Sequence, residues 1–499
     1  MRDSIQIYQK TLKEIKALDY ALNVISWDSS TVAPKGCFNN RSKYIGILAG
    51  NRHKLITNKE YIDAVNYLYK NRKELEENLQ YEITRVKREN DMMMKVPSNL
   101  YSSYYELLAV SNNVWEEAKL KNDFSLFYET LDNVIKITKK LTKYWSTQSL
   151  KGYNVLLDMY EPGFKKAKYD KFFNCLKEKL VPFVKKVLAK PIKVNECFFK
   201  NFSIEKQKEF TNYIAEVMKF DLNYGMIAES EHPFTSAFDI EDVRLTTHFY
   251  ENNLQSSIFS TIHELGHATY ERNISPDLAD TFSATGASMA MHESQSRFYE
   301  NIIGRHYNFW KVHYKKLKEI FHKELLHVSL HDFYMYINEV KASYIRTDAD
   351  ELTYPLHIML RYDIEKEIFD GNLETKDIEK RWNELFYEYF GIEVDKASNG
   401  VLQDVHWSGG SFGYFPTYAL GSAYAAQIYH SMIDDINLKA SLESGTTEEI
   451  NLWLKEKIHK YGASKSPNDI LLLATGKKFN PNYYVKYLIK KYSKIYGIK

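Results

Sequence analysis

The sequence predicts a mainly α-helical protein with one small β-sheet, and three observations support this fold class. Apolar residues recur at steps of three and four along most of the 499-residue chain, as they do in amphipathic helices. Only 11 prolines interrupt this pattern, which favours long helices. One short run, 242–249, is rich in β-branched and aromatic residues and is the best strand candidate. No repeat or low-complexity linker divides the chain, so we expect a single domain over residues 1–499.

The N-terminal part of the chain is predicted to consist of helices separated by short breaks. Residues 5–25 place apolar side chains at helical spacing, and Pro34 and Gly36 then break the pattern. The charge-rich segment 59–94 is predicted to be a helical region with a solvated face. Pro97 marks the start of a further helix, because proline is tolerated only in a first helical turn.

The remainder of the chain alternates long helical segments with one extended region. Helical periodicity continues through 124–220, whereas 228–242 contains a turn-like Glu-His-Pro-Phe sequence. The strand at 242–249 follows, and an exposed edge there could hold an extended peptide by main-chain hydrogen bonds. Helices are predicted again over 295–344 and 356–369, where an Asp-Gly pair ends the second one.

The composition argues for a globular protein of a reducing compartment. Hydrophobic residues make up 44% of the chain, and the net charge is only +2, so no basic surface points to nucleic acid. The three cysteines are odd in number and lack metal-ligand spacing, so reduced thiols are expected. Lysines interrupt the N-terminal apolar pattern, which excludes a signal peptide and favours the cytoplasm.

One segment, 405–433, contains no Asp, Glu, Lys or Arg and is long enough to span a bilayer. It also contains four glycines, a proline and two histidines, which a spanning helix would rarely carry. We therefore expect a buried, irregular segment that lines a cleft, and no membrane partner.

The sequence His-Glu-Leu-Gly-His at 263–267 points to metal chemistry. It lies in a predicted helix, 256–270, where His263 and His267 are one turn apart on the same face. Two imidazoles so placed can bind one metal ion, and neutral imidazole suits zinc. Glu264 lies beside them and can take a proton from a metal-activated water. Because such a match can also arise by chance, the motif needs an independent third ligand.

That third ligand is predicted in the segment 287–297, because a catalytic zinc ion usually has three protein ligands and one open position. The residues of this segment that precede His292 and Glu293 are uncharged and mostly small. A second helix entering here could present Glu293 to the metal, which would give the ligand set of thermolysin-type enzymes. His292 is the competing ligand. We favour the alternative that its ring lies behind the metal ligands or contacts the substrate.

Several motifs together resemble those of the M32 metallocarboxypeptidases, the thermostable carboxypeptidase family. The matching segments are His-Pro-Phe at 232–234, Asp-Val-Arg-Leu-Thr at 242–246, His-Glu-Leu-Gly-His at 263–267, His-Glu-Ser-Gln at 292–295, Ile-Arg-Thr-Asp-Ala-Asp at 345–350 and Gly-Val-Leu-Gln-Asp-Val-His-Trp at 400–407. Near the N-terminus, Trp27-Asp28 with Thr31, Pro34, Gly36 and Arg41 is also similar, although Ser29 and Ala33 stand where Gln and Met are more usual. The resemblance spans nearly the full chain in the family's order.

The resemblance implies a gluzincin-type zinc peptidase with a small β-sheet beside the active-site helix and a long substrate groove. The N-terminal helical region, about 1–120, is expected to flank or cover this groove. Members of the family remove single residues from peptide C-termini by means of zinc or sometimes cobalt. They are commonly cytosolic homodimers, so the same is expected here.

The resemblance also assigns groups that would stabilise the oxyanion formed during peptide hydrolysis, which needs a hydrogen-bond donor. His406 and Tyr418 are the candidates. Tyr414 is a rival for Tyr418, because both lie in the same uncharged segment, and it could contact the substrate.

A carboxypeptidase must also bind a free carboxylate, which the planar fork of arginine does through two hydrogen bonds. The resemblance points to Arg346, and Asp350 could orient it or form a purely structural ion pair with it. Arg244 is the second candidate, although a neighbouring Asp242 favours a structural pair there. His232 is assigned to the substrate by the resemblance alone.

Two rival functions remain open from the sequence. An oligopeptidase that cuts internally could use the same helix and ligands, although Arg346 argues against it. A helical binding protein could instead carry a structural metal, but such a zinc site more often has four protein ligands. The carboxypeptidase interpretation is favoured over both.

Overall fold

The computed structural model describes residues 1–199 and 201–498, and it confirms a mainly helical protein with one small sheet. Two compact units are present. The first comprises Met1–Asp91, Asn195–Ile337 and Ile428–Lys478, and the second comprises Met92–Val194, Asn338–Gln427 and Phe479–Lys499. The expectation of a single domain over residues 1–499 stays a prediction, as does the groove covered by residues 1–120.

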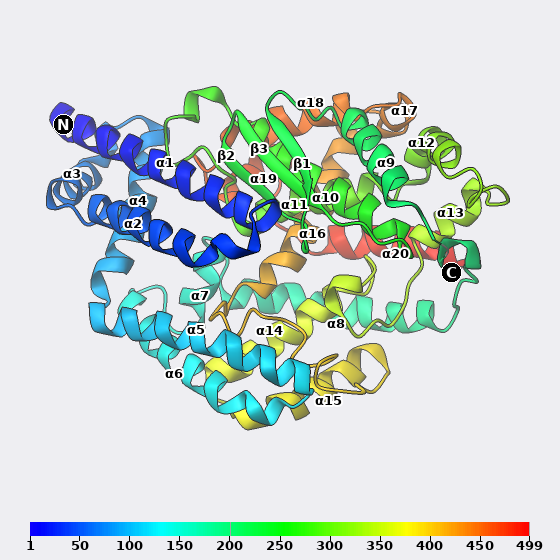
Figure 1. Cartoon of the computed structure of the whole chain (residues 1–499), viewed down its shortest axis with the longest axis horizontal. Coiled ribbons are helices and arrows are strands. Elements are labelled where there is room, and N and C mark those ends of the chain that lie inside the picture. The colour runs from blue at the N-terminus through cyan, green and yellow to red at the C-terminus, as the bar shows by residue number, and fades with distance from the viewer. Residues whose placement is uncertain (200, 499) are drawn as a thin grey trace. The chain divides into compact units, whose positions relative to one another are not determined.

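The first unit begins with α1, Arg2–Thr31, which is longer at both ends than the predicted helix, and with α2, Phe38–Ile56. Figure 1 shows these two as neighbouring blue helices. The predicted break between them contains the 3₁₀ turn η1, Lys35–Cys37. Tyr8, Leu12 and Ile15 of α1 form a buried cluster with side chains of α3, Lys59–Lys70, and α4, Glu77–Lys95.

The predicted helical region 59–94 is interrupted by η2, Arg72–Glu74. Leu68 before the break and Ile83 after it both belong to the buried cluster of α1. In one straight helix they would be separated by about 22 Å, which is too far for both to pack against the same residues. The chain therefore turns between them.

The sheet has the order β1-β3-β2 and is formed by β1, Gly225–Glu229, β2, Thr235–Asp239, and β3, Asp242–Thr247. The predicted strand is confirmed as β3, but the expectation that it has an exposed edge is wrong. It lies in the centre, parallel to β1 and antiparallel to β2. The segment predicted as turn-like lies between two strands that the sequence did not predict. β1 ends at Glu229, and β2 begins at Thr235, soon after the His232-Pro233 turn.

Helix α10, Leu254–Arg272, packs against β3, α9 and α11 and carries the paired histidines (Figure 1). The Asn253 side chain caps its N-terminus by accepting a hydrogen bond from the Ser256 amide. Gly266 allows α11, Met289–Arg297, to approach closely, because a Cβ at this position would lie 2.8 Å from Ser296 Cα. This contact between the two helices places the functional side chains.

The other elements of the first unit surround α10 and α11. A single π-helical turn, η6, Phe298–Ile303, continues α11, and further helices follow in the range 295–344, where helices were predicted. The remaining elements are η4 (Glu196–Phe199), α9 (Ile204–Val217), η5 (Pro276–Leu278), α12 (Tyr307–Ile320), α13 (Leu330–Ile337), α17 (Leu438–Glu443), α18 (Glu448–Lys457), η9 (His459–Tyr461) and α19 (Pro467–Thr475).

The second unit is helical among the residues described. Its core helix is α14, Tyr354–Asp370, which buries His357, Arg361 and Glu365 on successive turns and ends at Gly371 as predicted. The remaining elements are α5 (Ser98–Lys121), η3 (Phe124–Leu126), α6 (Tyr128–Trp145), α7 (Tyr153–Tyr160), α8 (Lys166–Leu188), η7 (Arg346–Asp348), η8 (Thr375–Asp377), α15 (Ile378–Phe390), α20 (Asn482–Tyr496) and the first part of α16 (Phe415–Asp435). The residues of α16 from Ile428 on belong to the first unit.

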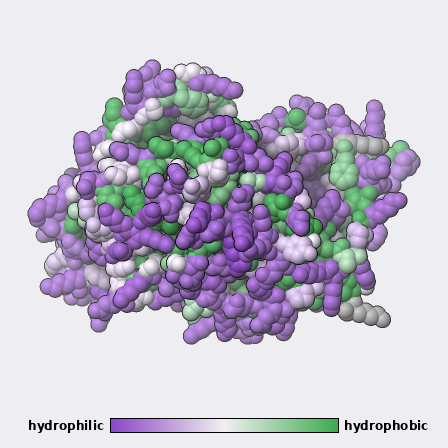
Figure 2. Space-filling model, turned by 90° about the horizontal axis from the view of Figure 1, so that it is seen from below, coloured by the Kyte–Doolittle hydropathy of each residue, from purple (hydrophilic) through white to green (hydrophobic). Residues whose placement is uncertain are grey.

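The uncharged segment 405–433 is largely buried, but only its first part is irregular, because α16 begins at Phe415. Across the described residues, the helices are all too short or too polar to cross a membrane. Figure 2 shows a face covered mostly by hydrophilic side chains, with apolar ones in small groups between them.

Candidate metal centre

The three predicted metal ligands meet in the first unit. His263 and His267 lie on successive turns of α10, and Glu293 lies on α11 opposite them. Glu293 Oε2 is 3.6 Å from His263 Nε2 and 3.5 Å from His267 Nε2. One ligand atom from each residue lies within 4.8 Å of the other two. The structure thus brings together residues from two helices that the sequence linked only by motif.

This donor set fits a transition-metal ion. Distances of 3.5 and 3.6 Å are too long for good hydrogen bonds between the histidines and the carboxylate. Two ligand atoms bound to one tetrahedral zinc ion would be about 3.4 Å apart at the usual bond lengths. Two imidazoles and one carboxylate therefore have both the chemistry and the spacing that zinc requires, and His263, His267 and Glu293 would hold it.

His263 is held from behind by a carboxylate that sequence analysis missed. Its Nδ1 donates to Glu300 Oε2 at 2.9 Å, which leaves Nε2 facing Glu293. Arg297 bridges the two carboxylates, because its Nε donates to Glu293 Oε1 and its Nη1 to Glu300 Oε2. The signal for these residues was the spacing Glu293, Arg297, Glu300, which places them on one face of a helix.

Burial and neighbouring charges shift the pKa values of the two histidine ligands in opposite directions. Burial alone would lower the pKa of His263, but the carboxylates of Glu293 and Glu300 raise it above its ordinary value. Burial would raise the pKa of Glu293, yet Arg297 and the histidines hold it well below its usual range. Burial lowers the pKa of His267 to about 3, so this ring is neutral near pH 7, as a metal ligand must be.

Glu264, the predicted base, is held by strand β2. The Thr235 hydroxyl donates to Glu264 Oε2 at 2.6 Å and lies 3.0 Å from the main-chain oxygen of the same residue. Burial raises the pKa of Glu264 above its ordinary value. A carboxylate of raised pKa is a stronger proton acceptor, so the position suits general-base chemistry. Thr235 was missed, although it directly follows the His-Pro-Phe motif.

His292 lies behind His267 rather than among the three ligand atoms. Its Nδ1 is 2.5 Å from His267 Nδ1, and its Nε2 is 2.6 Å from Glu271 Oε1. Both ring nitrogens thus have partners other than a metal. The geometry supports the alternative that placed His292 behind the ligands.

The two other candidates of the first unit lie at the sheet. Arg244 on β3 donates to both carboxylate oxygens of Asp242 at 2.8 Å, and its guanidinium packs over the Phe238 ring. This is the structural pair that the sequence favoured. His232 lies exposed in the turn between β1 and β2, where its main-chain oxygen accepts from the Ser230 hydroxyl.

In the second unit, Arg346 pairs with Asp404. Its Nε and Nη2 donate to Asp404 Oδ1 at 3.1 and 2.9 Å, and its Nη1 contacts the Tyr354 hydroxyl at 3.3 Å. Arg361 pairs with the other oxygen of the same carboxylate through Nε at 2.8 Å. The two guanidinium groups hold the pKa of Asp404 well below its usual range despite burial.

The expectation that Asp350 orients Arg346 is corrected by this arrangement. Asp350 Oδ1 accepts from the amides of Leu352 and Thr353, and Oδ2 accepts from the Thr353 hydroxyl at 2.7 Å. The prediction rested on the four-residue spacing of Arg346 and Asp350, which corresponds to one turn of an α-helix. Only a 3₁₀ turn, Arg346–Asp348, is present, so Asp350 caps the turn before α14 instead.

The predicted oxyanion donors also lie together in the second unit. His406 Nε2 is 3.5 Å from the Tyr418 hydroxyl, and the His406 ring packs against Phe415 and Tyr414. Burial lowers the pKa of His406 to about 4. The ring is therefore neutral near pH 7, and one of its nitrogens carries a proton that it can donate.

A buried carboxylate that no sequence motif indicated fixes the loop that directly follows His406. Glu365 Oε1 accepts from Trp407 Nε1 at 2.8 Å, and its Oε2 accepts from the Tyr153 hydroxyl and the Gly413 amide, both at 2.7 Å. Burial raises the pKa of Glu365 to about 7. Glu365 therefore ties both ends of the loop 407–413 to α14.

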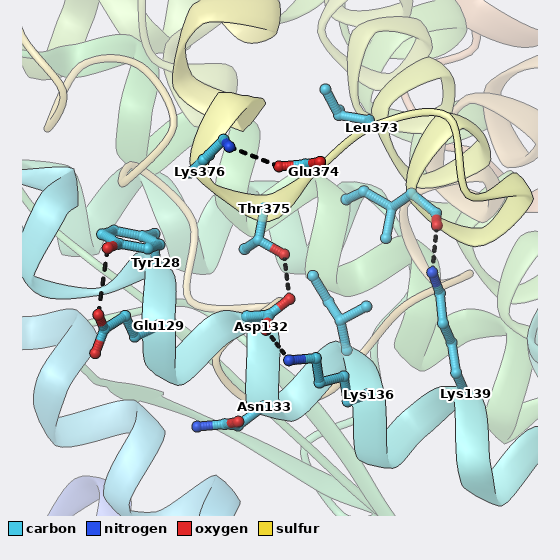
Figure 3. Close-up of a pocket in the computed structure, with 12 residues that line it drawn as sticks. Tyr128, Glu129, Asp132, Asn133, Lys136, Lys139, Leu373, Glu374, Thr375 and Lys376 are labelled. Atoms are coloured by element: carbon cyan, nitrogen blue, oxygen red, sulfur yellow. Dashed lines mark hydrogen bonds and ion pairs between the residues drawn. The ribbon is translucent and has the colours of Figure 1, made fainter.

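Figure 3 shows a pocket of about 550 Å³ in the second unit, between α6 and the segment 373–376. Its side chains are largely paired with one another, as Lys136 is with Asp132 and Lys376 with Glu374. Its lining, as far as the structure describes it, includes none of the predicted site residues. We interpret it as a surface hollow.

Comparisons with known proteins find similarity to metallocarboxypeptidases over nearly the whole chain. The model of a family described as "Carboxypeptidase Taq (M32) metallopeptidase" matches residues 7–492. Carboxypeptidase 1 of Bacillus subtilis is 42% identical over 498 residues, which cover 99% of both chains. Thermostable carboxypeptidase 1 of Pyrococcus furiosus is 35% identical over 96% of both chains. The crystal structure of an M32 carboxypeptidase from Deinococcus radiodurans has a TM-score of 0.96 at 27% identity, over 99% of this chain and 100% of that one.

Proposed function

We propose, from the premise that the chain belongs to the carboxypeptidase Taq (M32) family of metallopeptidases, that His263, His267 and Glu293 hold its catalytic zinc ion. Membership of this family makes the protein a metal-dependent carboxypeptidase. The observation that carries the proposal is the convergence of two imidazole Nε2 atoms and one carboxylate oxygen on one point. Cobalt could replace zinc, because both accept imidazole and carboxylate ligands.

A bound zinc ion would act as a Lewis acid that polarises the scissile carbonyl and makes water a nucleophile at neutral pH. Glu264 takes the proton of the attacking water on a carboxylate oxygen and passes it to the leaving amine. The Thr235 hydroxyl, which donates to Glu264 Oε2, helps to fix the plane of this carboxylate. Burial raises the pKa of Glu264, which suits a group that must hold a proton between two steps.

We assign the oxyanion to His406 and Tyr418, on the strength of the family resemblance and of their proximity to each other. Each can donate a hydrogen bond to an oxygen that gains negative charge. Tyr414, whose ring packs edge-on against Tyr418, contacts the substrate in this proposal. His232 and Arg244 are secondary candidates for substrate contacts, and the pairing of Arg244 with Asp242 weakens its case.

Arg346 is proposed to bind the free carboxylate of the peptide. Asp404 fixes the plane of its guanidinium, and a guanidinium carries more N–H groups than the contacts with Asp404 and Tyr354 use. Arg361 shares the same aspartate, so two cations face one anion and the cluster keeps a positive charge. This excess charge would attract a carboxylate.

The Arg346→Ala variant tests this assignment. We expect the KM for peptides with a free C-terminus to rise about tenfold to a hundredfold, because the variant loses one or two charge-assisted hydrogen bonds to the carboxylate. The KM for C-terminally amidated peptides should change little. Arg381→Ala, which removes a guanidinium paired with Glu367 on the same unit, is the control and should change neither KM. Equal losses on both peptides in Arg346→Ala would make its role purely structural.

The substrate would be peptides with a free C-terminus, and the working form would be a cytoplasmic homodimer without nucleic acid or membrane partners. Mass spectrometry of a digested peptide, with a free and with an amidated C-terminus, tests the activity. We expect ladders of single-residue loss from the free-ended peptide, abolished by a chelator and restored by zinc. Internal fragments would instead identify an oligopeptidase, and cleavage that survives chelation would overturn the metal mechanism.

A further inference from the structure

A chain of hydrogen bonds runs from His267 through His292 to a buried glutamate that the proposed mechanism does not use. Glu271 Oε1 is 2.6 Å from His292 Nε2, and His292 Nδ1 is 2.5 Å from His267 Nδ1. We propose that Glu271 is a positioning residue which, through His292, determines which ring nitrogen of His267 faces the metal. This inference rests on the proposed role of His267 as a metal ligand.

Each of these contacts requires a proton on one particular nitrogen. A carboxylate only accepts hydrogen bonds, so His292 must carry its proton on Nε2, where it meets Glu271. When the His292 ring carries only this proton, its Nδ1 is an acceptor, and the partner nitrogen, His267 Nδ1, must be the donor. The lone pair of His267 is left on Nε2, which is the atom 3.5 Å from Glu293. A proton on His292 Nδ1 would put the lone pair of His267 on the wrong nitrogen.

The surroundings hold the His292 ring in this one orientation. The Gly286 amide donates to the same Glu271 oxygen at 3.1 Å. A Cβ at position 286 would lie 2.5 Å from His292 Cδ2, so only glycine leaves room for the ring. The Tyr270 ring packs on another side, with centroids 5.3 Å apart. Glu271 itself is 3% exposed, so solvent cannot substitute for its carboxylate.

The two metal histidines differ in how they are supported. His263 donates directly to Glu300, whose carboxylate is also held by Arg297 and Arg305. His267 reaches its carboxylate only through a second imidazole. In many metal sites, a carboxylate that is hydrogen-bonded to a histidine ligand contributes to metal affinity. We therefore expect zinc affinity here to depend on Glu271, although Glu271 contacts His267 only through His292.

The test compares zinc affinities, measured by competition with a chromophoric chelator, for Glu271→Ala and Glu271→Gln. Loss of an outer carboxylate should weaken zinc binding about tenfold to a hundredfold in the alanine variant. The glutamine variant should recover most of this loss, because its carbonyl oxygen can still accept from His292. Equal affinity in the wild type and the alanine variant would overturn the inference.

Glu82 offers a matched control in the same unit. It is also buried, at 2% exposed, and accepts from the Ser283 amide and hydroxyl and from the Tyr8 hydroxyl rather than from a histidine. The Glu82→Ala variant should lose stability yet keep zinc affinity within about twofold of the wild type. A matching fall in its zinc affinity would show that any buried carboxylate here matters, and would overturn a specific role for Glu271.

Two further measurements keep the inference testable if Glu271→Ala fails to fold. Gly286→Ala displaces the His292 ring and leaves the carboxylate in place, so it too should weaken zinc binding, and unchanged affinity would contradict the proposal. Neutron diffraction of the zinc-loaded wild type should show deuterium on His292 Nε2 and His267 Nδ1, whereas deuterium on His292 Nδ1 would overturn it. If the wild type binds no zinc, the proposed function is overturned together with this inference. If the wild type binds zinc tightly but the variants do not weaken binding, only the inference about Glu271 is overturned.

Discussion

Two buried clusters of charged and ionisable groups, one in each unit, are arranged in opposite ways. In the first unit, His263 and His267 face Glu293 across 3.6 and 3.5 Å, beyond good hydrogen-bonding distance. In the second unit, Arg346 and Arg361 close directly on Asp404, with contacts of 2.9 and 2.8 Å. The first cluster is held apart by groups behind it, and the second is held together by its own charges.

This difference separates a cluster arranged to bind a metal ion from a cluster whose central carboxylate is neutralised by its own arginines. The acceptor atoms of the metal cluster point to one centre, and outer partners such as Glu300 and Arg297 prevent them from pairing with one another. The carboxylate of Asp404 is instead neutralised within the chain. Changes in the first cluster should therefore affect zinc binding and turnover, whereas the loss of Asp404 from the second should mainly affect stability.

The largest expected effect is on turnover in the metal cluster. Glu264→Gln removes the proton acceptor and keeps the size of the side chain, so kcat for peptide hydrolysis should fall about a hundredfold to ten-thousandfold. Zinc content, measured by atomic emission, should stay at the wild-type value because the three ligands are untouched. Turnover that survives this change would remove Glu264 as the base.

The arginine cluster should respond in stability. Asp404→Asn leaves two buried guanidinium groups without their anion, so the free energy of unfolding should fall by about 3–5 kcal/mol. Urea unfolding measures this loss, and chelator competition should show an unchanged zinc affinity. Lost zinc affinity with unchanged stability would contradict the division of roles between the clusters.

Glu365, which is hydrogen-bonded to both ends of the loop 407–413, should make the stability depend on pH by a similar amount. Burial raises its pKa in the folded chain to about 7, above the ordinary value of 4.5. The folded state therefore binds more protons than the unfolded state between these values, and stability is lost as pH rises through them. The loss amounts to about 3 kcal/mol between pH 4.5 and pH 7.

Glu365→Gln isolates this effect because glutamine resembles the protonated form and does not titrate. Urea unfolding at several pH values should show the wild type losing stability relative to the variant as pH rises over that range. The difference should be constant below pH 4.5. Parallel pH profiles of the two proteins would contradict a raised pKa at Glu365.

The smallest expected effect concerns the packing of α10 on α11. A Cβ at Gly266 would meet Ser296 Cα at 2.8 Å, so Gly266→Ala should destabilise the chain by about 1–3 kcal/mol and weaken zinc binding by moving Glu293. Gly46→Ala, in helix α2 where nothing lies within 4 Å, is the control and should stabilise by about 0.5–1 kcal/mol. Unaltered zinc affinity in Gly266→Ala would show that the close helix approach is not needed to place Glu293.

The features that could be predicted from the sequence are those that depend on the spacing of neighbouring residues. The helix of His263 and His267 and the helix that brings Glu293 were both found, because periodicity and motif spacing are properties of neighbouring residues. Glu271 and Glu365 were missed, because their roles depend on contacts that form only when separate segments pack. Asp350 was assigned wrongly for the same reason, since its orientation depends on a 3₁₀ turn that sequence spacing does not distinguish from a helix.

Anomalous X-ray diffraction at the zinc edge, on crystals of the zinc-loaded wild-type protein, tests the central claim most directly. We predict one peak in the first unit at about 2.0–2.2 Å from His263 Nε2, His267 Nε2 and Glu293 Oε2. A peak bound by other residues, or a protein that takes up no zinc while it cleaves peptides, would contradict the assignment of the metal centre.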